Sequence, residues 1–260
     1  MDVIKSLLET TTIGNRIIAG NGNTSSSSSK KLQLEYNHPE EDWPYIWAIR
    51  NGETLDWKND CETDEEIFEI AMQQQYLPVK IADGLYLGDS TCIQDTILDE
   101  EDGDNFKEIG YILNMAGHDV VTRKTVNQLR KRNITYKVIP CLDQIDYPLL
   151  EKHWYDAYEY IQKATTTSNT KISRGNAVLV HCRVGWNRSV LIIAAYYMMT
   201  TQTPILQTIQ HIRKLRGNSA LQNEGFQIQL VSFARKYNLL DNSSDSTLLP
   251  SNIPPISQLP

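Results

Sequence analysis

The sequence contains little cysteine, and its cysteines lie far apart. Four occur in 260 residues, at positions 61, 92, 141 and 182, and no two form a Cys-x-x-Cys pair. Structural zinc sites and the disulfide frameworks of small secreted proteins both depend on closely spaced cysteines. The spacing argues against both, and we expect no metal and no cofactor. A single cysteine in a special local setting becomes the residue to explain.

The sequence also lacks an excess of positive charge and a long hydrophobic segment. Its formal net charge is −7, so no overall field attracts the chain to nucleic acid or to an anionic membrane. The longest apolar run, Val190–Met199, is too short to cross a bilayer, and residues 1–6 do not resemble a secretory signal. We expect an intracellular protein, cytoplasmic or nuclear or both, with no membrane or specific nucleic-acid partner; the oligomeric state is not indicated.

Composition divides the chain into four regions. Residues 1–34 are predicted to be a flexible N-terminal segment that includes a Ser-rich linker. Residues 35–77 are rich in Asp and Glu but also hold three tryptophans. This acidic extension is either a solvated arm or an ordered segment that packs on the main domain through its aromatic side chains. Residues 78–240 form the main domain, and the Ser/Pro-rich residues 241–260 are predicted to be a disordered tail.

Strand-like and helix-like segments alternate through the main domain. Short apolar or alternating segments predict strands at 80–88, 111–116, 134–140 and 176–182, the first being a hairpin with a turn at Asp83-Gly84. A 3.6-residue periodicity predicts helices at 121–132, 148–165, 188–200, 204–216 and 222–238. This alternation predicts an α/β three-layer sandwich, in which helices flank a central, mainly parallel sheet.

One stretch at the end of the last predicted strand combines several chemical groups. Residues 179–190 read LVHCRVGWNRSV, which places a tight loop between the carboxyl end of a strand and the amino end of a helix. Ligands bind at such places in α/β proteins, and the free N–H groups of the helix favour an anion. The turn at the glycine lets successive N–H groups form a concave nest. The predicted anion-binding residues are Arg183, Val184, Gly185, Trp186, Asn187 and Arg188.

The side chains of this loop suit transfer of a phosphoryl group to sulfur. A helix N-terminus and nearby cations lower a cysteine pKa from about 8.5 to about 3.5–7.5, so Cys182 is predicted to be a nucleophilic thiolate. Arg188 can hold two phosphate oxygens at once, and Ser189 can donate a hydrogen bond to the departing sulfur. We expect His181 to fix the loop rather than to act as a base. Taken singly, these residues have ordinary structural explanations; their combination in nine residues favours catalysis.

The stretch HCRVGWNRS resembles the H-C-x-x-G-x-x-R-S/T signature of cysteine-based protein phosphatases, and it is most similar to the dual-specificity branch. Weaker similarities follow in the family's order: DGLYLGD (83–89), IGYILNMAG (109–117), ITYKVIPCLD (134–143) and NEGFQIQL (223–230). The resemblance covers about residues 78–240. It implies a cysteine-phosphatase-like fold and a dual-specificity phosphatase catalytic domain for that region.

The resemblance also implies a role for each matching residue. Cys182 is the nucleophile that becomes phosphocysteine, Arg188 clamps the phosphate, and Ser189 assists departure of the thiolate. Asp143 matches the general acid that protonates the leaving oxygen and then activates water. Asp146 is a nearby competitor for that role, although its position before Tyr147-Pro148 also suits a helix N-cap.

Three functions remain open. The leading interpretation is a phosphatase that acts on phosphotyrosine and on phosphoserine or phosphothreonine in phosphoprotein substrates, with Asn223 of the final motif in a supporting role. Asn187 stands where many dual-specificity enzymes carry Ser, and the G-x-N-R pattern also resembles RNA 5′-triphosphatases. A phospho-binding pseudophosphatase scaffold is disfavoured because the Cys, the Arg and the acid are all present. A basic cluster at 123–132 is either a solvated helix face or a docking face for an acidic partner.

Overall fold

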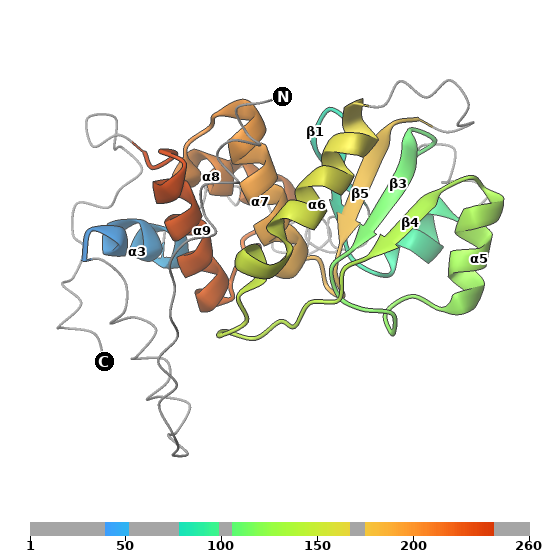
Figure 1. Cartoon of the computed structure of the whole chain (residues 1–260), viewed down its shortest axis with the longest axis horizontal. Helices are drawn as coiled ribbons and strands as arrows, with labels where there is room; N and C mark the ends of the chain where they lie inside the picture. The colour runs from blue at the N-terminus through green and yellow to red at the C-terminus, as the bar shows by residue number, and fades with distance from the viewer. Residues whose placement is uncertain (1–39, 52–77, 99–105, 167–174, 242–260) are drawn as a thin grey trace, which may run out of the picture. The chain divides into compact units, whose positions relative to one another are not determined.

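Five short strands form one sheet in the order β1-β2-β5-β3-β4 in a computed structural model that describes residues 40–51, 78–98, 106–166 and 175–241 (Figure 1). β1 (Val79–Ala82) and β2 (Leu85–Gly88) form the predicted antiparallel hairpin. The central strand β5 (Ala177–His181) runs parallel to β2 and to β3 (Ile109–Asn114), and β3 runs parallel to β4 (Thr135–Val138). The prediction of a mainly parallel sheet is confirmed.

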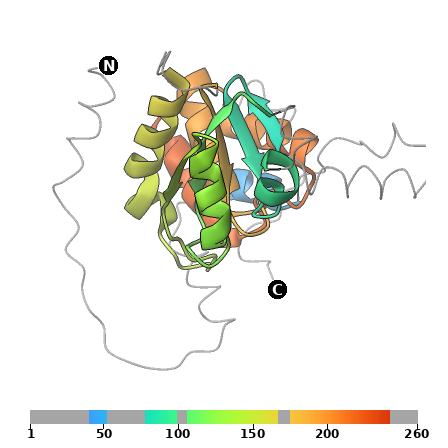
Figure 2. The ribbon, with the colours of Figure 1, turned by 90° about the vertical axis from the view of Figure 1, so that its right-hand side faces the viewer.

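Helices cover both faces of the sheet, as the predicted three-layer sandwich requires. The predicted helices are all present, and each begins and ends within two residues of its predicted bounds: α5 (Arg123–Lys131), α6 (Leu149–Thr166), α7 (Arg188–Thr201), α8 (Ile205–Arg216) and α9 (Glu224–Lys236). α6 and α7 pack on one face, where Tyr160 of α6 contacts Tyr111 of β3 edge to face. α5 lies over the other face, and Figure 2 shows α6 and α5 as separate layers.

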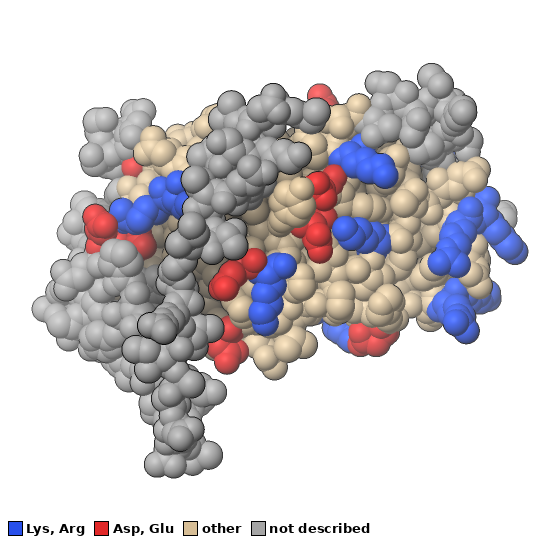
Figure 3. Space-filling model, viewed as in Figure 1, with Lys and Arg blue, Asp and Glu red and all other residues tan. Residues whose placement is uncertain are grey.

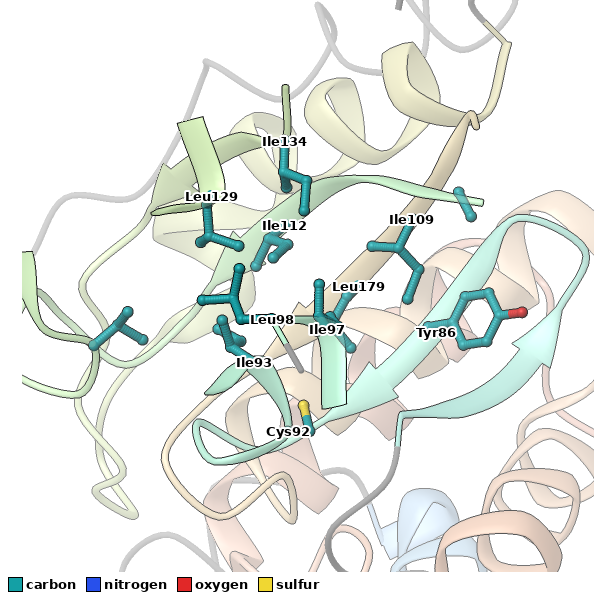
Figure 4. Packing of buried hydrophobic residues seen from close by; sticks show 12 residues of the cluster. Tyr86, Cys92, Ile93, Ile97, Leu98, Ile109, Ile112, Leu129, Ile134 and Leu179 are labelled. Carbon is teal, nitrogen blue, oxygen red and sulfur yellow. The ribbon is translucent and has the colours of Figure 1, made fainter. Parts of the chain in front are cut away.

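The core on the α5 face includes an element that the sequence did not predict. A π-helical turn, η3 (Ile93–Ile97), follows β2 and buries Ile93 and Ile97 completely. These side chains pack with Ile112 of β3 and with Leu129 of α5 (Figure 4). Burying each such aliphatic side chain stabilises the fold by about 1.5–3 kcal/mol, so this cluster anchors α5 firmly to the sheet.

Part of the acidic extension packs on the main domain. The short turn η1 (Glu40–Asp42) and helix α3 (Trp43–Asn51) lie against α9 and α8. Trp43 is buried, and Arg235 of α9 forms ion pairs with Asp42 and with Glu41. The ordered alternative therefore applies to this part of the extension, while its remaining residues lie outside the described residues.

The described part of the fold includes Asp241, the first residue of the predicted tail. Asp241 is buried, its carboxylate accepts a hydrogen bond from the Leu206 N–H (2.9 Å), and its carbonyl accepts one from the Tyr45 hydroxyl (2.8 Å). The rest of the predicted tail, residues 242–260, lies outside the described residues. Among the described helices, none is both long and apolar enough to cross a bilayer.

Candidate active site

Three loops meet at one edge of the sheet. His181 of β5 pairs in register with Asn114 of β3, and Asn114 pairs with Val138 of β4. Because these strands are parallel, their carboxyl ends lie side by side. The Met115 N–H donates to the His181 carbonyl (2.8 Å), which ties the loop after β3 to the end of β5. The site is therefore built where α/β sheets ordinarily bind ligands.

The loop from Cys182 to Asn187 curls around the cysteine sulfur. The Gly185 N–H lies 3.2 Å from Cys182 Sγ, and the Ser189 hydroxyl donates to the same sulfur at 3.3 Å. Gly185 has φ +74°, and a Cβ there would lie 2.6 Å from both the Gly88 carbonyl oxygen and Arg216 Nη2. Only glycine fits this turn without strain, so the predicted reason for a glycine is confirmed and gains a steric cause.

The surroundings of Cys182 favour its thiolate. Burial, which leaves the residue 1% exposed, raises its pKa, as removal of a charge from water must. The hydrogen bonds from the Ser189 hydroxyl and backbone, the charge of Arg188 and the Gly185 N–H lower that pKa and together outweigh burial. The pKa of Cys182 therefore lies below the ordinary value of 9.0, which is the direction that a nucleophilic thiol needs.

Arg188 begins α7 and is held beside the acid loop, residues 141–147. Its Nη1 donates to the Cys141 carbonyl (3.1 Å), and its Nε lies 3.5 Å from Asp143 Oδ2. The residue is buried, and its Nε has no hydrogen-bond acceptor among the described residues. A buried guanidinium N–H without an acceptor is costly, so this edge of Arg188 is suited to an anionic oxygen.

Asp143 is brought to the catalytic loop by two asparagine side chains. Asn223 Nδ2 donates to Asp143 Oδ1 (2.9 Å), and Asn187 Nδ2 donates to Asp143 Oδ2 (3.4 Å). Asn187 Oδ1 in turn accepts the N–H groups of Gln222 (2.9 Å) and Asn223 (3.0 Å). Asn187 therefore links the catalytic loop, the start of α9 and the predicted acid.

The acid loop also rests directly on α9. A Cβ at Gly225 would lie 1.7 Å from the Ile145 carbonyl oxygen, so the close approach of loop and helix requires glycine. Gln229 donates to the Tyr147 carbonyl (2.9 Å) and accepts the Leu150 N–H (3.1 Å). Sequence reasoning had missed both residues, although they belong to the stretch NEGFQIQL.

The expected cap role of Asp146 is wrong. Gln229, which comes from a distant helix, satisfies the Leu150 N–H at the start of α6. Asp146 itself is exposed. An N-cap side chain accepts the N–H two or three positions later, but residue 148 is proline and the Leu149 N–H donates to the Tyr147 carbonyl (2.9 Å). Asp146 therefore serves as a natural control for Asp143.

A buried ion pair supports the catalytic loop from behind. Arg216 donates to the Val184 carbonyl (3.2 Å), and its guanidinium lies 3.4 Å from Asp89 Oδ2. Asp89 Oδ1 accepts the N–H groups of Thr91 (2.9 Å) and Cys92 (3.0 Å), which also sets the start of η3. Sequence reasoning had missed this pair, because its members lie 127 residues apart.

His181 contacts the backbone at the start of the loop. Its Nδ1 lies 2.9 Å from the Cys182 carbonyl oxygen, so Nδ1 carries the proton and donates. Burial lowers the pKa of His181 to about 4, which keeps the ring neutral at physiological pH. A neutral ring that is engaged with the backbone fixes the turn at Cys182.

The other predicted loop residues take part mainly through their backbone. Trp186 accepts the Leu221 N–H (2.6 Å), and the Arg183 carbonyl accepts the Ser90 N–H (3.2 Å). The Arg183 side chain is exposed and pairs with Asp119 (2.5 Å). Val184 is exposed, at 39%. Within the described residues no group of three or more His, Cys, Asp or Glu side chains could hold a metal; the prediction of a metal-free reaction stays a prediction.

The sequence matches the family model described as "Dual specificity phosphatase, catalytic domain" over residues 85–236. This match covers more than half of the chain and includes residues 182–188, residues 141–147 and helix α9. The chain belongs to the dual specificity phosphatase catalytic domain family, as the sequence motifs predicted.

Individual relatives agree with this assignment. Dual specificity protein phosphatase 1 of Arabidopsis thaliana is 26% identical over 186 residues, which are 71% of this chain and 83% of that protein. Protein phosphatase Slingshot of Drosophila melanogaster is 25% identical over 66% of this chain, but the alignment covers 14% of its own length. Among solved structures, a variant of human DUSP28 shares the fold with a TM-score of 0.50 at 20% identity, covering 62% of this chain and 97% of that one.

Proposed function

We propose that this protein hydrolyses phosphate monoesters of tyrosine and of serine or threonine in phosphoproteins, through a phosphocysteine intermediate. One observation carries the proposal: a cysteine whose pKa is lowered shares a site with a buried arginine edge and an exposed carboxylate. A nucleophile, an anion clamp and an acid are the groups that phosphoryl transfer to sulfur requires.

In the first step the Cys182 thiolate attacks phosphorus, and the bond from phosphorus to the ester oxygen breaks. The Arg188 guanidinium and the N–H groups of the loop stabilise the oxygens of the transferring group. Asp143 donates its proton to the leaving oxygen, which departs as an alcohol or a phenol. This step leaves a phosphoryl group on sulfur and a carboxylate on Asp143.

In the second step water attacks the phosphocysteine. The Asp143 carboxylate accepts a proton from that water, and the bond from phosphorus to sulfur breaks. The Ser189 hydroxyl, 3.3 Å from the sulfur, donates to the thiolate as it leaves. Inorganic phosphate is released, Asp143 is again protonated, and the Cys182 thiolate is restored.

An RNA 5′-triphosphatase remains the second candidate, because Asn187 suggested it. Both ends of the Asn187 amide are engaged, with Asp143 on one side and the start of α9 on the other. This contact pattern gives Asn187 a role in holding a general acid, and an acid matters most for the poor leaving groups of phosphate monoesters. The pattern supports the monoester phosphatase over the triphosphatase.

The test compares wild-type protein with Cys182→Ser on p-nitrophenyl phosphate, on phosphotyrosine, phosphoserine and phosphothreonine peptides, and on an RNA with a 5′-triphosphate. We expect wild-type hydrolysis of the ester and the peptides, undiminished by EDTA, and no measurable activity in the variant. The variant should still bind vanadate or phosphate. Wild-type-like activity of Cys182→Ser rejects the nucleophile, and exclusive activity on the RNA rejects the monoester substrate.

A further inference from the structure

Helix α5 carries a concentrated positive charge in a chain that is negative overall. Residues 123–132 contain five Lys and Arg and no Asp or Glu, whereas the whole chain has a net charge of −7. One face of the helix is committed to the core: Leu129 is fully buried, and Thr125 is buried beside it. The opposite face exposes four basic side chains, which we call the basic stripe: Arg123, Lys124, Arg130 and Lys131.

The four side chains of the basic stripe form two pairs along the helix, Arg123 with Lys124 and Arg130 with Lys131. At 3.6 residues per turn they all fall within an arc of about 120°. Arg123 and Arg130 are seven residues apart, as are Lys124 and Lys131, and seven residues correspond to about 10.5 Å along the axis. Figure 3 shows blue side chains over α5, with no red among them on that face.

The stripe has no acidic partner within the part of the chain that the structure describes. None of the ion pairs found there involves its four residues. The neighbouring Arg132 points elsewhere, because it donates to the carbonyls of Ile97 (3.0 Å) and Leu98 (2.7 Å). Like charges on one helix face repel one another, so a negatively charged ligand would gain from all four.

The stripe begins beside the catalytic loop. β3 runs toward the active-site edge of the sheet, and α5 starts just after it, with the Thr122 hydroxyl accepting the Thr125 N–H (3.1 Å). Asp119 binds the side chain of Arg183, which adjoins Cys182. Arg123 follows Asp119 by four residues, so their Cα atoms are at most about 14 Å apart. A ligand that reaches Cys182 can therefore continue onto the stripe.

We propose that the basic stripe binds an acidic, extended stretch of the phosphoprotein substrate, next to the phosphorylated residue. An extended chain advances about 3.3 Å per residue, so acidic residues three positions apart match the spacing of about 10.5 Å between the two basic pairs. A nucleic acid fits less well, since the chain is negative overall and the stripe offers no aromatic side chain for stacking on bases. This inference rests on the proposed phosphatase function.

The test uses two phosphotyrosine peptides that differ only in flanking residues, one with Glu at every third position and one with Gln. In the stripe variant Arg123, Lys124, Arg130 and Lys131 are all replaced by Gln. We expect KM for the acidic peptide to rise about tenfold, the scale of several exposed charge pairs. The kcat, the KM for the Gln peptide and the rate with p-nitrophenyl phosphate should not change.

A control variant removes positive charge elsewhere, by Lys163→Gln, Lys214→Gln and Lys236→Gln on α6, α8 and α9. It should leave the preference for the acidic peptide intact. An unchanged KM for the acidic peptide in the stripe variant overturns the proposal. A competition experiment on Cys182→Ser protein compares two competitors of the bound acidic phosphopeptide, a single-stranded RNA and an acidic peptide without phosphate. The proposal is also overturned if the RNA displaces the phosphopeptide at the lower concentration.

Failure of the proposed function is recognised separately. If wild-type protein does not hydrolyse p-nitrophenyl phosphate, the phosphatase proposal fails, while fluorescence anisotropy of the labelled acidic peptide still measures binding to the stripe. Weaker binding to the stripe variant than to the lysine control then supports the docking surface. Equal binding to both overturns it.

Discussion

The nucleophile loop and the acid loop are built in opposite ways. In the nucleophile loop, residues 182–188, the sulfur of Cys182 is contacted by Gly185 and by Ser189, which directly follows the loop. The acid loop has little internal structure of its own. It is held by Arg188 and by Asn223, Gly225 and Gln229 of the distant helix α9. The contacts to the Cys182 sulfur are therefore local in sequence, whereas the acid loop is positioned by the packing of α9.

This difference separates two requirements of the proposed reaction. The nucleophile loop must hold the thiolate and the phosphate for every substrate. The acid loop matters in proportion to how poor the leaving group is. Substitutions in the two loops should therefore be distinguishable by comparing a phosphopeptide with p-nitrophenyl phosphate, whose leaving group departs without a proton.

The largest effect is expected for the acid itself. Asp143→Asn should slow phosphopeptide hydrolysis by about 10²–10⁴-fold, the usual contribution of acid–base catalysis. The first step with p-nitrophenyl phosphate should be nearly unaffected. The matched control Asp146→Asn removes an exposed carboxylate three residues away and should leave both substrates near wild type. The reverse pattern in steady-state rates would make Asp146 the acid.

Breaking the nucleophile loop should affect both substrates alike. Gly185→Ala forces a side chain into a left-handed backbone conformation and within 2.6 Å of the Gly88 carbonyl oxygen. The loop must shift, and the N–H group that contacts the sulfur moves with it. We expect kcat/KM to fall by about 10²–10³-fold, the scale of losing an anion-stabilising donor. A selective loss on the phosphopeptide would contradict this view of the loop.

Displacing the acid loop alone should have a smaller and selective effect. Gly225→Ala places a Cβ 1.7 Å from the Ile145 carbonyl oxygen, so the loop must move away from α9 and carry Asp143 with it. We expect the phosphopeptide rate to fall by about 10–10²-fold, as misplacement of a catalytic group does. The first step with p-nitrophenyl phosphate, measured as the initial release of p-nitrophenolate, and the circular dichroism spectrum should change little. Equal losses in the first step with both substrates would mean that the change at Gly225 also disturbs residues 182–188, which the start of α9 contacts through Asn187.

The two cysteines at the site should differ in their pH dependence. The pKa of Cys182 lies below its ordinary value of 9.0, whereas burial raises the pKa of Cys141 to about 12. Because only the thiolate is alkylated, iodoacetamide should modify Cys182 with a midpoint below pH 9. Cys141 should stay unmodified throughout that range, as followed by peptide mass spectrometry. Ser189→Ala, which removes a donor to the sulfur, should move the Cys182 midpoint upward.

The sequence predicted the elements whose signals are local. The strands and helices of the main domain, the turn at Gly185 and the partners of Cys182 all follow from periodicity or from one short motif. The supports of the acid loop did not, because Gly225 and Gln229 act only through contact with residues about 80 positions away. The local signal for a cap at Asp146 also failed, because the Leu149 N–H donates to the Tyr147 carbonyl.

The sequence also failed to predict the ion pair behind the nucleophile loop, because its two members lie far apart in the chain. Asp89 and Arg216 are ordinary residues in their own segments, and their roles depend on the sheet that brings β2 beside β5. The turn η3, which follows β2, was also not predicted from the sequence. The Asp89 side chain accepts the backbone N–H groups of Thr91 and Cys92, just before this turn begins.

The central claim is a covalent phosphocysteine at residue 182, and trapping it is the most direct test. Asp143→Asn protein would be mixed with p-nitrophenyl phosphate, quenched in acid within one turnover and mapped by mass spectrometry. The good leaving group lets the first step proceed, while loss of the base slows hydrolysis of the intermediate. We expect a phosphoryl group on Cys182 and none in the double variant that also carries Cys182→Ser. Release of p-nitrophenolate with no phosphoryl group on the protein, or with one on another residue, would contradict the account.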